Sequence, residues 1–172
     1  MTPGLRKFVL TVHLTVSVGW IGAVVAYLAL GVSAVTSPDP QTVRAALIAM
    51  ELTGWYVIVP LALAALLTGI IMSLGTSWGL FRHYWVLISL GLTVFSTVIL
   101  LLHMPTVSML ADRAQIADET GLTGFGSDLL HPGVGLVVLL VITGLNVYKP
   151  RGLTPYGWRK QQERRTVLAP EV

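Results

Sequence analysis

Four long apolar runs dominate this 172-residue sequence and restrict what it can fold into. They cover about residues 8–32, 55–74, 84–104 and 132–148, and each is close to the ~20 residues that a helix needs to cross a bilayer. A chain in lipid must satisfy its backbone amides within each segment, so each run is expected to be a helix. The sequence therefore predicts an all-α protein, with a four-transmembrane-helix bundle over residues 1–148.

The composition excludes several classes of protein. Only 11% of the residues are charged and 54% are hydrophobic, whereas soluble domains carry about 25% charged residues. That shortage excludes an ordinary soluble enzyme and a disordered chain. The chain has no cysteine, which excludes a disulfide-stapled domain, covalent haem attachment and thiolate ligation. Fingerprints of nucleotide-binding and hydrolytic enzymes are absent.

Positive charges gather on one side of the predicted bundle. Nine of the eleven lysines and arginines belong to this group: Arg6, Lys7, Arg82, Lys149, Arg151, Arg159, Lys160, Arg164 and Arg165. The positive-inside rule then predicts an N-in/C-in topology, with both termini cytoplasmic. Residues 149–172 are expected to form a basic cytoplasmic tail against anionic lipid. The predicted partner is thus the lipid bilayer, and not nucleic acid.

Several segments are expected to continue the spans. The Ser37–Pro40 turn starts a helix over residues 41–53 that extends the second span, and Pro60 is expected to kink it. Residues 105–117 can extend the third span beyond the bilayer. Small residues such as Gly69, Gly133 and Gly135 are typical of close helix packing.

Polar residues within the third span form a stripe on one helix face. They recur at spacings of three, four or seven: Arg82, Ser89, Thr93, Ser96 and His103. Such a stripe should face the bundle interior. It does not by itself predict a pore, because serine and threonine also hydrogen-bond to their own helix.

The four histidines are the main candidates for chemistry. His13 lies roughly 9 Å inside the first span, and His83 lies at the inner mouth of the third. His103 ends the third span and His131 begins the fourth, so both lie near the outer boundary. Facing imidazoles at one height in a four-helix bundle can hold a haem iron or a metal ion. For His103 and His131, ligation and an ordinary interfacial role remain equally open.

Carboxylates offer an alternative metal set. Glu51 and Asp128 also fall near the outer boundary, where they could join His103 and His131 as ligands for copper, zinc or iron. Met104 could add a sulfur ligand.

Two aromatic residues share a helix face with His13. Trp20 and Tyr27 follow it at intervals of seven, a pattern typical of packing or of a cofactor wall. The string His13, Trp20, Tyr27-Leu28 resembles the first helix of the HemJ family, which implies a membrane protein that binds haem in porphyrin oxidation. Ser89 stands where that family has a functional lysine.

Two further resemblances involve other residues. His13 with Gly19, Trp20 and Gly22 is similar to the membrane domains of CopD-type copper-resistance proteins, which implies copper handling. The segments Trp78–Val86 and Leu101–His103 resemble an uncharacterised family of bacterial, actinobacterial-looking integral membrane proteins. That likeness implies a multi-pass protein of the bacterial plasma membrane.

The leading hypothesis is a small b-type haem protein for electron transfer or porphyrin-related redox chemistry. His103 and His131 are then one axial pair, and His13 is a separate ligand with His83 or Ser89 nearby. The remaining cofactor-binding residues are Trp20 and Tyr27 along the porphyrin edge and Arg82 on a propionate. An enzyme of this kind would be a haem-dependent membrane oxidoreductase.

Two other functions remain open. One is a copper, metal or small-solute transport module that uses the outer ligands and the polar stripe. The other is a non-catalytic scaffold, either as a homo-oligomer or within a larger membrane redox complex.

Overall fold

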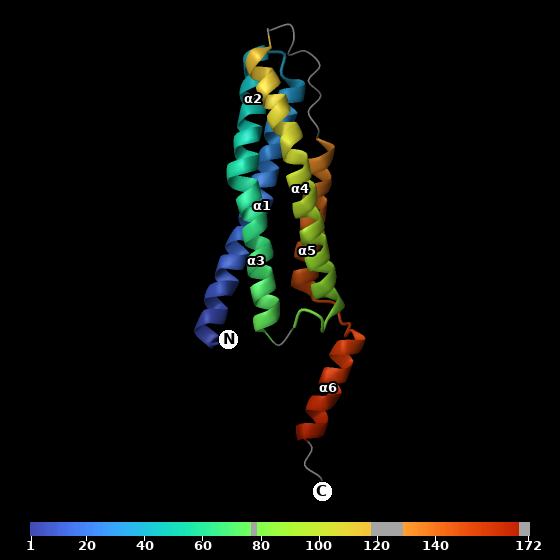
Figure 1. The fold of residues 1–172 in the computed structure, drawn as a ribbon. Helices are drawn as coiled ribbons and strands as arrows, with labels where there is room; N and C mark the ends of the chain where they lie inside the picture. Colours follow the sequence, from blue (N-terminus) through green and yellow to red (C-terminus); the bar gives the residue numbers. More distant parts are fainter. Residues whose placement is uncertain (77–78, 118–128, 169–172) are drawn as a thin grey trace.

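The computed structural model describes residues 1–76, 79–117 and 129–168, and the chain there is helical. The elements are α1 (Pro3–Thr36), α2 (Pro40–Thr53), the π-helical turn η1 (Gly54–Ile58), α3 (Val59–Gly75), α4 (Tyr84–Ile116), α5 (Leu130–Tyr148) and α6 (Pro155–Leu168). The stretch from α2 to α3 is continuous. With α1, α4 and α5 it makes four helices long and apolar enough to cross a membrane. Figure 1 shows them packed side by side, with α6 extending beyond one end.

The predicted fold class is confirmed, and the helices are longer than the predicted spans. The expected helix over residues 41–53 is α2, and residues 105–116 do continue α4. α1 begins at Pro3 because the Thr2 hydroxyl accepts a hydrogen bond from the backbone N–H of Leu5. Apolar length marks only the part of a helix that suits lipid, whereas capping residues mark where it ends.

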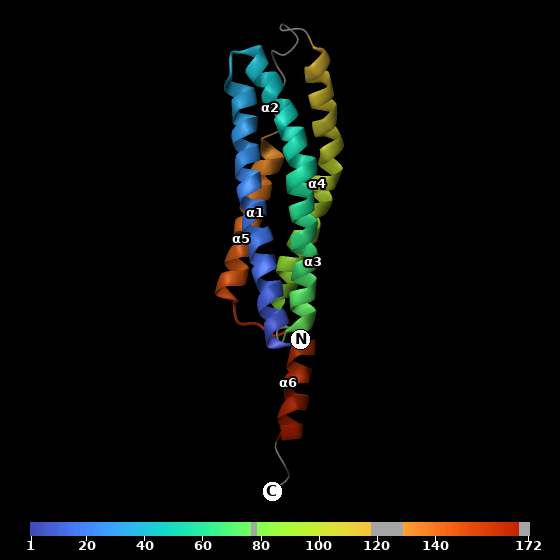
Figure 2. The same ribbon diagram turned by 90° about the vertical axis from the view of Figure 1, so that its left-hand side faces the viewer.

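The basic tail contains a helix. The sequence predicts a polar, basic segment from residue 149, and residues 155–168 of that segment form α6. Figure 2 confirms that α6 continues away from the bundle at the end where the N-terminus lies.

The opposite end of the bundle is held by Asp39 and Arg44. The Asp39 carboxylate accepts hydrogen bonds from the Thr42 hydroxyl at 2.6 Å and from two backbone N–H groups of α2, and these bonds lower the pKa of Asp39. Arg44 donates to the carbonyls of Ala114 and Ala117 at 2.8 and 2.7 Å. A cation at the last carbonyls of a helix is favourable, so α2 fixes the end of α4.

A π-helical turn precedes Pro60 in the core. The backbone N–H of Val59 bonds to the Gly54 carbonyl, five residues back, and this wider turn relieves the clash that a proline imposes on the preceding turn. Met104 from α4, 1% exposed, packs against this turn. A Cβ on Gly54 would lie 2.6 Å from the Met104 Cε. The kink that was expected at Pro60 is thus a π-helical turn, against which Met104 packs.

α5 is the least buried span. Its apolar window is 6% buried inside the bundle, against 22–28% for the other three. Leu139 is the residue of α5 that joins the described core. Contrary to the prediction of close packing, no atom of the described residues lies within 4 Å of a Cβ at Gly133 or Gly135. α5 therefore lies at the margin of the bundle.

Gly54→Ala should destabilise the bundle by about 1–2 kcal/mol, because the added methyl overpacks Met104. The measurement is unfolding of the detergent-purified chain by sodium dodecyl sulfate. Gly91→Ala in α4 is the control, since nothing lies within 4 Å of its Cβ position. Equal stability of the two variants would show that Met104 has room to move.

Candidate functional site

His103 and His131 meet across α4 and α5. Their ring centroids are 4.4 Å apart and their planes differ by 16°, so the two imidazoles stack. His103 is half-buried and His131, in the first turn of α5, is exposed on the isolated chain. The two residues are 28 positions apart in the sequence, and the expectation that they share one height agrees with their contact.

The stacked arrangement is not itself a ligating one. A metal bound to an imidazole nitrogen lies in the plane of that ring at ~2.0 Å. Two nearly parallel, separated planes share no such point, so at least one ring must turn out of the stack to ligate. The two candidate donor side chains are therefore adjacent, but the orientation of at least one ring must change before both can ligate one iron or metal ion.

The alternative carboxylate set is not assembled in the described part of the chain. Within residues 1–76, 79–117 and 129–168 there is no group of three histidine, aspartate or glutamate side chains that could hold a metal ion. Glu51 therefore does not complete such a group there, and Asp128 lies outside the described residues. Met104, the candidate sulfur ligand, packs against Gly54 in the core.

His13 is paired with a threonine of the neighbouring span. Its Nδ1 lies 2.9 Å from the Thr68 hydroxyl oxygen. That hydroxyl also lies 2.7 Å from the Ala64 carbonyl, to which it donates. While the hydroxyl donates to the Ala64 carbonyl, its oxygen can accept a hydrogen bond from a protonated Nδ1 of His13.

Gly69 allows this close approach. A Cβ at position 69 would lie 3.3 Å from the Cε1 of His13. Gly69 and Thr68 of α3 together form the surface against which the His13 imidazole of α1 packs. Here Gly69 has the packing role that the sequence predicts.

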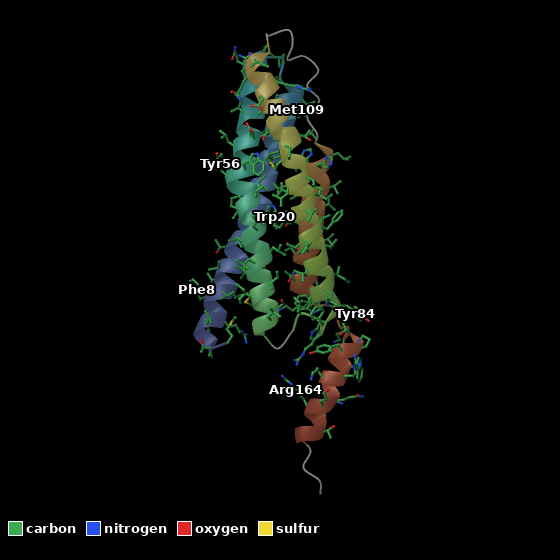
Figure 3. All side chains as sticks on the ribbon, in the orientation of Figure 1. Phe8, Trp20, Tyr56, Tyr84, Met109 and Arg164 are labelled. Atoms are coloured by element: carbon green, nitrogen blue, oxygen red, sulfur yellow. The ribbon has the colours of Figure 1, made fainter. Side chains whose placement is uncertain are left out.

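Trp20 and Tyr27 belong to the bundle core. Each is 5% exposed, and Tyr27 lies near the contact between Gly54 and Met104. Figure 3 shows Trp20 midway along the bundle. Their spacing of seven thus corresponds to core packing in this structure.

The polar stripe on α4 is largely satisfied by protein groups. The Thr93 hydroxyl donates to the Ser89 carbonyl of its own helix at 2.8 Å. Thr97, which is not part of the predicted stripe, bonds in the same way to the Thr93 carbonyl. Ser89 is buried, and its hydroxyl accepts a hydrogen bond from the Asn146 amide of α5 at 3.3 Å. Ser89 therefore joins α4 to α5.

Arg82 and His83 lie apart from the other candidates, where α4 begins. Residue 83 pairs with Leu153 in an isolated β-bridge, and its ring centroid lies 6.4 Å from that of Trp85. Both Arg82 and His83 line a cleft against the segment that follows α5. The predicted haem-binding residues thus occupy separate parts of the chain: the α1–α3 contact, the core, the α4–α5 contacts and this cleft.

The predicted site residues do not include Thr68 and Asn146, the partners of His13 and Ser89. The pairing with Thr68 could have been predicted from depth in the membrane. Thr68 and His13 lie at about the same distance, along their own spans, from the end of the bundle that carries the positive charges. Asn146 carries no comparable signal, since an amide near a helix end is equally compatible with a headgroup contact.

Comparison with known proteins identifies no relative. No family model matches the chain, and neither does any curated protein or solved structure.

A double-mutant cycle tests the pairing of His13 with Thr68. His13→Phe and Thr68→Val should show a coupling free energy of about 1 kcal/mol in detergent, the size found for hydrogen bonds between transmembrane helices. Thr143→Val is the matched control, because the Thr143 hydroxyl bonds to Leu139 of its own helix. A coupling as small as that of His13→Phe with Thr143→Val would contradict the pairing.

Proposed function

We propose that this protein is a membrane-bound b-type haem protein that acts in electron transfer, with His103 and His131 as the axial ligands. The observation that carries the proposal is the contact of these two imidazoles, which come from different candidate membrane spans. Histidine nitrogen is an established axial ligand of b-type haem.

The number of donors favours haem over a bare metal ion. A copper or zinc ion held by protein alone takes three or four side-chain ligands, and no group of three acidic or histidine side chains suited to an ion occurs among the described residues. Haem supplies four nitrogens of its own and asks the protein for two more. Among the described residues, the pair of histidines is therefore a sufficient protein contribution for haem.

The position of α5 supports access for a large planar group. Because α5 is the least buried span, a change in its distance from α4 disrupts less apolar packing than the same change at α1 would. Within α5 itself, no described atom lies within 4 Å of a Cβ at Gly133 or Gly135. When bound, the haem would supply a one-electron couple; the chain would hold the iron and exclude water.

The test is the absorption spectrum of detergent-purified protein from cells supplied with a haem precursor, oxidised and then dithionite-reduced. We expect a sharp Soret band and reduced α and β bands. His103→Ala and His131→Ala should each lose the low-spin spectrum, because one axial ligand is gone. His13→Ala is the comparison variant, since its imidazole is paired with Thr68 and not with the axial pair.

A flat spectrum of the wild-type chain would contradict the proposal. So would full haem content in His103→Ala and His131→Ala. Metal analysis of the same sample then decides between the other two functions: bound copper would indicate a metal-handling module, and a metal-free sample would indicate a scaffold.

We infer further that both termini face the cytoplasm of a bacterial cell. The N-terminus and α6 lie at one end of the bundle (Figure 1), and nine of the eleven positive charges of the sequence belong to segments at that end. The positive-inside rule assigns that end to the cytoplasm.

Because the chain has no cysteine, single cysteines can report this orientation. In intact cells a membrane-impermeant maleimide should label Pro38→Cys, which lies in the connection after α1 at the opposite end. It should label Gln162→Cys in α6 only after permeabilisation. The reverse pattern would overturn the orientation.

A further inference from the structure

A cleft of about 700 Å³ lies at the basic end of the bundle. Its walls are the start of α4, the segment of residues 149–154 that follows α5, and one face of α6. Figure 3 shows Tyr84 where the bundle meets α6, and Arg164 on α6. The volume is within the range of about 300–1,000 Å³ that is typical of small-molecule sites.

Backbone hydrogen bonds fix the walls of this cleft. The N–H of Thr154 donates to the Arg82 carbonyl at 3.0 Å, and the N–H of Tyr84 donates to the Gly152 carbonyl at 3.2 Å. The Thr154 side chain is buried; it donates to the Phe81 carbonyl and accepts from the N–H of Gly157 at 3.1 Å. The cap that starts α6 therefore also attaches α6 to the chain segment before α4.

Gly157 brings α6 into contact with that segment. A Cβ at position 157 would overlap the carbonyl oxygen of Arg82. Glycine is therefore required for α6 to lie this close, and the docking of α6 can be disrupted without a change of charge.

The lining of the cleft is strongly basic. Its cationic side chains are Arg82, Lys149, Arg151, Lys160 and Arg164, and none of the described residues that line it is acidic. Lys160 bonds to Glu163 at 2.8 Å, on the same helix. Glu163 raises the pKa of Lys160, and the positive charge of Arg82 opposes that rise. Like charges of the two walls thus lie close enough to repel each other, and a bound anion would relieve that repulsion.

The cleft also contains aromatic residues suited to a membrane surface. Trp85 and Trp158 both line it, and tryptophan is enriched at the level of lipid headgroups. α5 ends at Tyr148 and α4 begins at Tyr84, so the cleft lies where two candidate spans leave the apolar region. Basic pockets at this level between membrane helices bind phosphorylated headgroups.

We propose that this cleft binds a phosphate group, presented by the headgroup of an anionic phospholipid. The arginines provide planar donor groups that fit phosphate oxygens, and the tryptophans lie against the glycerol region. The proposal does not depend on haem binding at His103 and His131. Those two residues lie in the halves of α4 and α5 that are farther from the cleft.

The experiment titrates the detergent-purified full chain with soluble dihexanoyl phosphatidylglycerol and follows the heat of binding. The test variant is Arg151→Gln with Arg164→Gln, which removes two cleft charges. The matched control is Arg159→Gln with Arg165→Gln, which removes two charges of α6 that do not line the cleft. We expect saturable binding that is about tenfold weaker in the test variant and unchanged in the control.

A second pair of variants keeps every charge. Gly157→Ala should weaken binding to a similar degree, because α6 can no longer dock against Arg82. Gly91→Ala in α4 should bind normally, since Gly91 does not line the cleft and no described atom lies within 4 Å of its Cβ position. Circular dichroism should show an intact helical bundle in the two double variants and in the two glycine variants.

Two further titrations identify the source of the phosphate. Dihexanoyl phosphatidylcholine, which has no net charge, should bind at least tenfold more weakly than phosphatidylglycerol. If inorganic phosphate at the same concentrations bound as tightly as the lipid, the phosphate site would stand and its ligand would be a free anion. Equal losses in the two double variants, or no saturable binding by the wild-type chain, would overturn the proposal.

Discussion

The structure depends on one constraint, which is that lipid offers no hydrogen bonds. Backbone amides must be satisfied within their own helix, and each polar side chain inside the bundle must have a protein partner or bear the cost of desolvation. Thr93 and Thr97 meet this requirement by bonding to their own helix. His13 and Ser89 meet it by bonding across helices, to Thr68 and Asn146. Among the residues that the structure describes, no buried side-chain nitrogen or oxygen lacks a partner.

This requirement explains which parts of the molecule could be predicted. The number of candidate membrane spans, the fold class and the extensions over α2 and the end of α4 depend on local sequence: apolar length, capping residues and prolines. The approach of His103 to His131 was also accessible, because depth in the membrane follows from position along a span. Depth does not give rotation about the helix axis, however. Three features depend on that rotation: the stacking of the two imidazole rings, the contact of His13 with Thr68, and the location of Trp20 in the core.

The tail shows a different limit. Its composition marks it as basic and polar, which predicts its charge but not its docking. α6 is positioned by Thr154 and Gly157 against backbone atoms near Arg82, more than 70 residues earlier in the chain. Residues of this kind leave no periodic pattern. A threonine and a glycine near a proline are equally typical of a turn, and only the three-dimensional structure distinguishes the two cases.

The two ends of the bundle treat positive charge in different ways. At one end Arg44 is directed at the final carbonyls of α4, whose partial negative charge the protein itself supplies. At the other end, five cationic side chains surround one cleft with no acidic residue among its described walls. A fold that only needed positive charge for orientation could scatter it over the surface. The backbone bonds of Thr154 instead hold the cationic side chains of two walls around one cleft, where Arg82 and Lys160 repel each other. A ligand that brings negative charge would reduce this repulsion, and at the membrane surface the abundant source of negative charge is lipid phosphate.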